Sequence, residues 1–116
     1  MIIGTLQETI NGEYRVAISP ESCKKLKALG NTILIEKNAG INSSFTNASY
    51  EEAGAELFDN KLDITNKVDI LLSVTSIPDE EILKTSKNNL ILVGTFSPYE
   101  NYKKLKSFFK TITNIN

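Results

Sequence analysis

Short apolar runs and longer amphipathic stretches alternate along the chain, and each apolar run has the length of a β-strand. The runs fall at residues 1–6, 32–36, 55–58, 68–74, 89–95 and 111–115. The run at 68–74 has a continuous apolar centre, Ile70-Leu71-Leu72, which is typical of a strand that is covered on both faces in a parallel sheet. The pattern therefore predicts six strands.

Helical patterns occupy the intervals between these runs. The best defined begins at Ser19-Pro20, because the hydroxyl can cap the first turn and proline loses no hydrogen bond at the first helical position. Its apolar residues lie on one stripe, and Gly30 can end it in the left-handed conformation. Further helices are expected at 48–53, at 59–67, after Pro78 and at 98–110, with a loop at 37–47. Strands that alternate with helices predict an open parallel α/β sheet.

The composition is that of one soluble globular domain, expected to span residues 1–116. Apolar residues make up 41% of the chain and charged residues 23%, and a chain of this size can bury about two thirds of its unfolded surface. Thirteen basic and fourteen acidic residues leave a net charge of −1. No long-range field therefore favours nucleic acid or anionic lipid. The lysines within 103–110 are interpreted as a solvated helix face.

The sequence contains few residues that are suited to metal binding or redox chemistry. Cys23 is the only cysteine and histidine is absent, so an intramolecular disulfide, a thiolate metal cluster and the commonest zinc ligand are excluded. We interpret Cys23 as a small buried hydrophobic residue. The apolar runs are too short to cross a bilayer, and the opening residues do not form a leader peptide. A reducing, cytoplasmic location is expected.

Motifs for nucleotide binding and for catalysis are also missing. The glycines at 4, 12, 30, 40, 54 and 94 never form the Gly-x-Gly-x-x-Gly pattern that brings a backbone close to a pyrophosphate, and no P-loop follows a strand. Without histidine, a serine or cysteine nucleophile lacks its usual base. Acidic pairs such as Glu51-Glu52 are explained by the dipole of a helix first turn. We therefore expect no cofactor, metal or catalytic residue in this chain.

Arg15 remains as the candidate for ligand binding. It is the only arginine, and it follows the first predicted strand. Its planar fork, at the carboxyl side of a parallel sheet, could clamp a small carboxylate. The alternative from the residues alone is a surface cation or an ion pair with Glu8 or Glu13.

Four blocks of sequence occur in the order found in one known family. They are Gly4–Pro20, Ile33–Gly40, Phe45–Ala55 and Val68–Val74. Together they resemble the amino-terminal domain of the alanine dehydrogenase and NAD(P) transhydrogenase alpha-subunit family, with the transhydrogenase alpha subunit as the nearer branch. The resemblance implies a flavodoxin-like, three-layer α/β/α domain. It also implies a chain that stops before the family's NAD-binding domain.

The resemblance further assigns positions of the family's substrate site. Arg15 stands where the family arginine holds the substrate carboxylate, and Ser73 stands where the family has a lysine. Ser97 falls near the histidine position of alanine dehydrogenases, and Ser97-Pro98 is more similar to the Trp-Pro of transhydrogenases. Serine in place of lysine removes a cation and most of the side-chain reach. Amino-acid dehydrogenation by this chain is therefore not expected.

The resemblance implies the amino-terminal part of a proton-translocating NAD(P) transhydrogenase alpha subunit, which passes hydride between NAD(H) and NADP(H) and is not catalytic alone. NAD(H) would be held by a missing domain or by a partner. The remaining alpha and beta subunits would be the partners and would bring the chain to the inner membrane only indirectly. Two alternatives stay open, a non-catalytic module that self-associates and a fragment of an alanine or saccharopine dehydrogenase.

Overall fold

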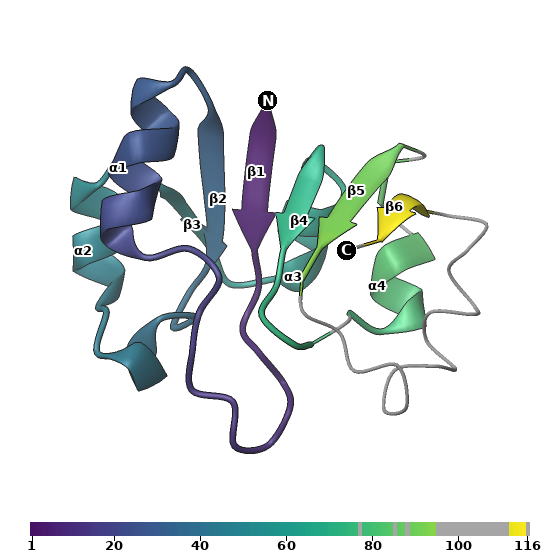
Figure 1. Ribbon diagram of the computed structural model, residues 1–116, viewed down its shortest axis with the longest axis horizontal. Coiled ribbons are helices and arrows are strands. Elements are labelled where there is room, and N and C mark those ends of the chain that lie inside the picture. The colour runs from purple at the N-terminus through teal and green to yellow at the C-terminus, as the bar shows by residue number, and fades with distance from the viewer. Residues whose placement is uncertain (77, 85, 88, 95–111, 116) are drawn as a thin grey trace.

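A computed structural model describes residues 1–76, 78–84, 86–87, 89–94 and 112–115. In these residues six strands form one sheet with parallel neighbours, in the order β3-β2-β1-β4-β5-β6 (Figure 1). The strands are β1 (Ile2–Thr5), β2 (Thr32–Glu36), β3 (Glu56–Phe58), β4 (Ile70–Leu72), β5 (Leu90–Val93) and β6 (Ile112–Ile115). Each lies within a predicted run, and the predicted open parallel α/β sheet is confirmed.

The strand order is that of the doubly wound 3-2-1-4-5-6 sheet and differs from the 2-1-3-4-5 order of flavodoxin. The chain adds β2 and β3 on one side of β1. Helix α3 (Lys61–Thr65) then leads it back, so that β4 pairs with the other side of β1. The direction of strand addition therefore reverses between β1 and β4. In open sheets of this kind, ligands bind outside the carboxyl ends of the strands at such a reversal.

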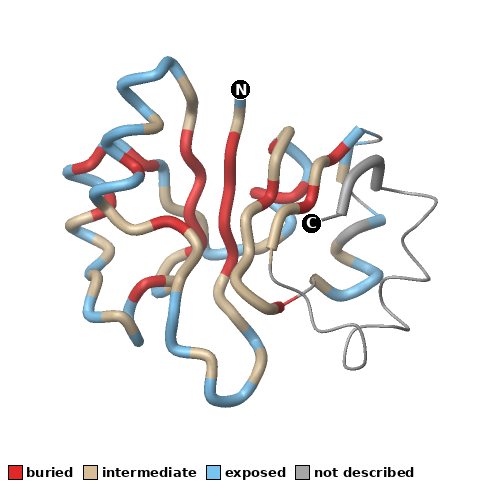
Figure 2. Tube along the Cα trace, viewed as in Figure 1, coloured by how far each residue is buried: buried red, intermediate tan, exposed pale blue. Residues whose placement is uncertain are grey.

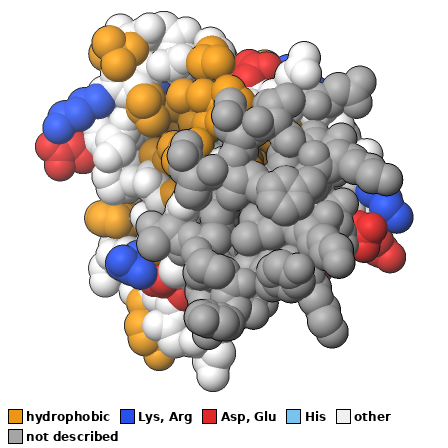
Figure 3. Space-filling view, turned by 45° about the vertical axis from the view of Figure 1, so that its right-hand side comes forward, with side chains coloured by type: hydrophobic (Ala, Val, Ile, Leu, Met, Phe, Trp, Pro, Cys, Tyr) orange, Lys and Arg blue, Asp and Glu red, His pale blue; other side chains and the backbone are white. Residues whose placement is uncertain are grey.

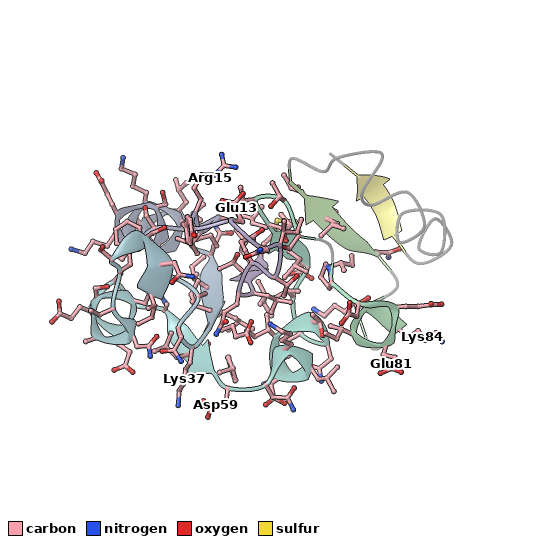
Figure 4. All side chains as sticks on the ribbon, turned by 90° about the horizontal axis from the view of Figure 1, so that it is seen from below. Glu13, Arg15, Lys37, Asp59, Glu81 and Lys84 are labelled. Carbon is pink, nitrogen blue, oxygen red and sulfur yellow. The ribbon has the colours of Figure 1, made fainter. Side chains whose placement is uncertain are left out.

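Helices cover both faces of the sheet and give the three expected layers. Helices α1 (Pro20–Ala28) and α2 (Asn47–Glu52) lie on one face, and α3 and α4 (Glu80–Lys84) lie on the other (Figure 4). The start of α1 is as predicted, because the Ser19 hydroxyl accepts a hydrogen bond from the Ser22 amide at 3.1 Å. Sequence periodicity thus located the helices correctly where the structure describes them.

Buried residues are concentrated in the central strands of the sheet (Figure 2), and each face of the sheet has its own apolar layer. Under α3 the buried residues are Leu6, Leu34, Ile64, Val68, Leu71, Leu90 and Leu92. Under α1 and α2 they are Ile3, Ile18, Cys23, Ile33, Ile35, Tyr50, Ala53 and Ala55. Gly4 lets α3 approach β1, because a Cβ at that position would lie 2.6 Å from Val68 Cγ1 and 2.8 Å from Ile64 Cγ2. Larger residues at this position would push the helix away.

The α1 face of the sheet becomes less covered towards β4. Ile70 and Leu72 pack against the layer under α1 and α2 but are only half-buried. Hydrophobic side chains gather on this side of the molecule in the space-filling view (Figure 3). The sheet therefore offers an apolar wall beside the reversal between β1 and β4.

The predicted loop at 37–47 contains a 3₁₀ turn at Ile41–Ser43, closed by Ser44 in the left-handed conformation. A 3₁₀ turn of three residues is too short to produce a hydrophobic repeat, so the sequence pattern could not predict it.

The predicted helix at 98–110 lies outside the described residues. Among the residues that the structure describes, no helix is long and apolar enough to cross a membrane.

Candidate functional site

An open groove of about 660 Å³ lies at the carboxyl ends of β4 and β5, beside the loop that follows β1. The loop after β1 contributes Arg15 and Ala17, and the end of β4 contributes Ser73. Ser43 and Phe45 line it from the segment after β2, and Gly94 from the end of β5. The groove therefore brings together Arg15 and Ser73, which are 58 residues apart in the sequence. It lies where ligands bind in sheets of this order.

Arg15 forms a two-pronged ion pair with Glu13. Arg15 Nε donates to Glu13 Oε2 at 3.0 Å and Arg15 Nη2 donates to Glu13 Oε1 at 2.8 Å. The Arg15 amide also donates to Oε2 at 3.0 Å. The arginine side chain is 72% exposed and the glutamate side chain only 8%. Arg15 projects outward at the edge of the molecule beside Glu13 (Figure 4). The ion pair with Glu13 that the sequence offered as an alternative to a carboxylate clamp is therefore present, and among the described residues no second partner contacts the other edge of the guanidinium.

The ion pair shifts the pKa values of both residues in the directions expected for opposite charges in contact. Side-chain and backbone hydrogen bonds from Arg15 lower the pKa of Glu13 to about 2. The hydrogen bond to Glu13 raises the pKa of Arg15. Glu13 is thus ionised near neutral pH. It neutralises the guanidinium that lines the groove.

Glu8 has a different role in the same loop. Its carboxylate accepts three consecutive backbone N–H groups, from Val74 at 3.0 Å and from Thr75 and Ser76 at 2.9 Å each. Such an arrangement of successive amides is a typical anion-binding concavity. Here a side chain of the chain itself occupies it. Glu8 therefore holds the loop after β4 against the loop after β1.

Two further contacts strengthen this connection between the loops. The Ser76 hydroxyl accepts hydrogen bonds from the amides of Thr9 at 2.8 Å and Ile10 at 3.3 Å. The Thr75 hydroxyl donates to Glu13 Oε1 at 3.1 Å. Glu13 therefore contacts both Arg15 and the loop that follows Ser73. We call residues 8–15 and 73–76, with these hydrogen bonds, the loop clamp.

Ser73 is half-buried at the start of the second clamp segment. Its amide donates to the carbonyl of Val93 at 2.9 Å, which continues the pairing of β4 with β5. Its short hydroxyl group adds no charge to the groove. Ser97, the third family position, lies outside the described residues. Among the described lining residues, Arg15 is thus the one cation, and it is already paired.

A second polar cluster lies on the α3 side of the same edge. Glu36 is buried, and its Oε1 accepts hydrogen bonds from Lys61 Nζ at 2.5 Å and from the Gln7 amide at 2.7 Å. A cavity of about 30 Å³ beside Gln7 and Lys61 also touches Ser73 and Ser76. This ion pair was not predicted from the sequence. Its partners are 25 residues apart and lie on different elements, so no local pattern reveals it.

The described residues offer little for metal binding or thiol chemistry. No cluster of three His, Cys, Asp or Glu side chains suited to a metal occurs in the described part of the chain. Cys23 is buried, its thiol contacts the Ala53 carbonyl at 3.7 Å, and burial raises its pKa. It therefore stays protonated, as the interpretation of a small hydrophobic residue requires. What the groove offers chemically is one open guanidinium edge, serine hydroxyls and an apolar wall.

Comparisons with known proteins agree on one family. Residues 4–115 match the sequence model of the family described as alanine dehydrogenase/PNT, N-terminal domain. The alanine dehydrogenase of Staphylococcus saprophyticus subsp. saprophyticus is 38% identical over 105 residues, which are 90% of this chain and 28% of that protein. A solved L-alanine dehydrogenase superposes with a TM-score of 0.86 at 25% identity, covering 98% of this chain and 31% of that one.

A second solved structure belongs to the other branch of the family. The transhydrogenase from Sinorhizobium meliloti superposes with a TM-score of 0.85 at 29% identity, covering 98% of this chain and 34% of that one. The chain thus spans about a third of the length of each relative. The two superpositions are nearly equal in TM-score, whereas the 38% identical sequence relative is an alanine dehydrogenase. The difference between them has to be sought in individual residues.

Proposed function

Because this chain belongs to the family of alanine dehydrogenase/PNT N-terminal domains, we propose that it is the first domain of a hydride-transferring enzyme of the transhydrogenase alpha-subunit type. We propose that it is not catalytic alone. NAD(H) would be bound by a separate nucleotide-binding part, and NADP(H) by a partner subunit. Contact with a membrane would then come only through that partner.

The observation that carries this proposal is the charge of the groove. Arg15 is neutralised by Glu13, and Ser73 supplies a hydroxyl where the resemblance implies a lysine. An enzyme that reduces a 2-oxo acid must hold an anion and stabilise negative charge as it develops on the carbonyl oxygen. A groove whose described cation is already paired is poorly suited to that task. It is compatible with a domain that supports hydride transfer without binding an amino acid.

The second candidate is the first domain of an alanine dehydrogenase. It is favoured by the name of the 38% identical relative and by the superposed L-alanine dehydrogenase. In that case the open edge of Arg15 would hold the carboxylate of pyruvate. Another hydrogen-bond donor would then have to replace the family lysine, whose position Ser73 occupies.

Chimeric enzymes separate the two candidates. In one chimera, residues 4–115 replace the matching domain of the Sinorhizobium meliloti transhydrogenase, and in the other they replace that of the staphylococcal alanine dehydrogenase. We expect the first to transfer hydride from NADH to an oxidised NADP analogue. We expect the second not to reduce pyruvate unless Ser73→Lys is added. Pyruvate reduction with Ser73 unchanged, together with an inactive first chimera, would overturn the proposal.

Binding to the chain itself gives an independent control. Titration with NADH should show no saturable binding, because no glycine fingerprint is present. Titration with pyruvate should show none either. Saturable pyruvate binding that Arg15→Ala abolishes would favour the second candidate.

A further inference from the structure

The tip of the first clamp segment is a tight turn at Asn11-Gly12. The Glu13 amide donates to the Ile10 carbonyl at 3.0 Å, which closes the turn. Gly12 has a φ of +87°, and nothing lies within 4 Å of the place where a Cβ would stand. Asn11 and Gly12 are both exposed. The turn thus presents an unshielded Asn-Gly peptide bond to water.

From this geometry we propose that Asn11 is a site of spontaneous deamidation, and that conversion to isoaspartate weakens the loop clamp. The backbone nitrogen of Gly12 attacks Asn11 Cγ, so that a nitrogen to Cγ bond forms, the Cγ to Nδ2 bond breaks and ammonia leaves. Water then opens the succinimide ring at one of its two carbonyls. The products are aspartate and isoaspartate.

Gly12 favours this attack because it has no side chain next to the attacking backbone nitrogen. Any Cβ on the following residue crowds the attacking nitrogen, and Asn11-Gly12 is the one Asn-Gly pair in the sequence. In the part of the chain that the structure describes, no hydrogen bond holds the Asn11 side-chain amide or the Gly12 amide. Both reacting groups are therefore free to approach each other.

Other asparagines of the chain provide a contrast. The Asn47 side chain accepts from the Asn38 amide at 2.8 Å and donates to Asn38 Oδ1 at 3.1 Å. Asn60 Oδ1 accepts from the Leu62 amide at 2.9 Å. These side chains are held by the fold, and the residues that follow them are alanine or lysine. Asn11 should therefore convert faster than either Asn47 or Asn60.

The position of the turn gives the modification a consequence. Glu8 lies three residues before Asn11 and Glu13 lies two residues after it, and both bind the segment 74–76. Isoaspartate inserts one extra atom into the backbone between these two anchors. The two carboxylates then cannot keep both sets of contacts without distortion. Arg15, which depends on Glu13, loses its fixed position in the groove.

The test is an incubation of the purified chain at several pH values, followed by peptide mapping. We expect the Asn11 peptide to gain one dalton, to be labelled by an isoaspartyl methyltransferase, and to convert several-fold faster than the Asn47 and Asn60 peptides. The rate should rise with pH, because the attacking nitrogen must lose its proton. Gly12→Ala should slow the conversion. An Asn11 peptide that converts no faster than the other two overturns the proposal.

The consequence for Arg15 is read by nuclear magnetic resonance. In the aged protein the Arg15 Nε–H signal should move or broaden, and Asn11→Asp, which adds charge without an extra backbone atom, should change it less. An unchanged Arg15 signal in fully converted protein would overturn the link to the clamp. This outcome is independent of whether the chain serves a transhydrogenase.

Discussion

The apolar layer beneath α1 and α2 and the loop clamp at the carboxyl edge lie next to each other but are held by different forces. The layer is held by non-directional burial, and most of its members are aliphatic residues within predicted elements. The clamp is held by directional hydrogen bonds between residues about 66 positions apart. Loss of one apolar side chain weakens the whole domain, whereas loss of one clamp carboxylate leaves particular donors unpaired.

The largest effect is expected from a buried strand residue. Leu71 is fully buried at the centre of β4, and Leu71→Ala should reduce the free energy of unfolding by about 3 kcal/mol through lost burial and a residual cavity. Urea unfolding measures the change. The matched control is Leu62→Ala on α3, which is partly exposed and should cost about 0.5 kcal/mol. Similar losses for the two variants would contradict the assignment of Leu71 to the core.

Removal of the Glu8 carboxylate should have the next largest effect and should be local. Glu8→Ala leaves the amides of Val74, Thr75 and Ser76 without their acceptor, which should cost about 2 kcal/mol. Hydrogen exchange of these three amides should accelerate, while exchange in β2 follows only the global change. Glu8→Gln, which keeps a neutral acceptor, should lie between Glu8→Ala and the parent. Unchanged exchange at 74–76 would show that the clamp does not form.

Tyr50 lies within the apolar layer but also makes a directional contact, because its ring is buried and its hydroxyl donates to the Ile18 carbonyl at 2.7 Å. Tyr50→Phe should cost about 1 kcal/mol by leaving that carbonyl unpaired. Burial raises the pKa of Tyr50 to about 12. The folded state therefore holds the phenolic proton more tightly than the unfolded state, and stability should fall as pH rises from about 10 towards 12. The part of this decline due to Tyr50 should be missing in Tyr50→Phe.

The smallest change in stability is expected for Glu13→Gln, although this substitution should specifically alter the position of Arg15 in the groove. The pKa of Glu13 is lowered to about 2 by Arg15, so its contribution is present above the ordinary pKa of 4.5 and is lost as pH falls towards 2. Glu13→Gln should remove this part of the acid dependence and shift the Arg15 Nε–H signal. Its effect near neutral pH should be smaller than that of Tyr50→Phe. An acid transition identical to that of the parent would contradict the ion pair.

Much of the fold was predictable because the signals are local. Ser19-Pro20 begins α1 as the capping rule requires, and the run at 32–36 coincides with β2. Gly30 and Gly54, which follow two helices, both have positive φ. The site was predictable only in part. Arg15 was found because it is the only arginine, and Ser73 through a family resemblance, whereas Glu8 and the Glu36–Lys61 pair carry no signal within a short window.

By itself, the sequence determined where strands and helices form, which residues are apolar enough to build the two layers, and which family the chain resembles. Those properties depend on periodicity and on residue type within a few positions. The tertiary structure alone decided that β4 returns to the side of β1, and hence that Glu8 and Glu13 meet the segment 73–76. A side chain selects its partner from whatever the strand order places within hydrogen-bond reach, and local periodicity does not specify that order.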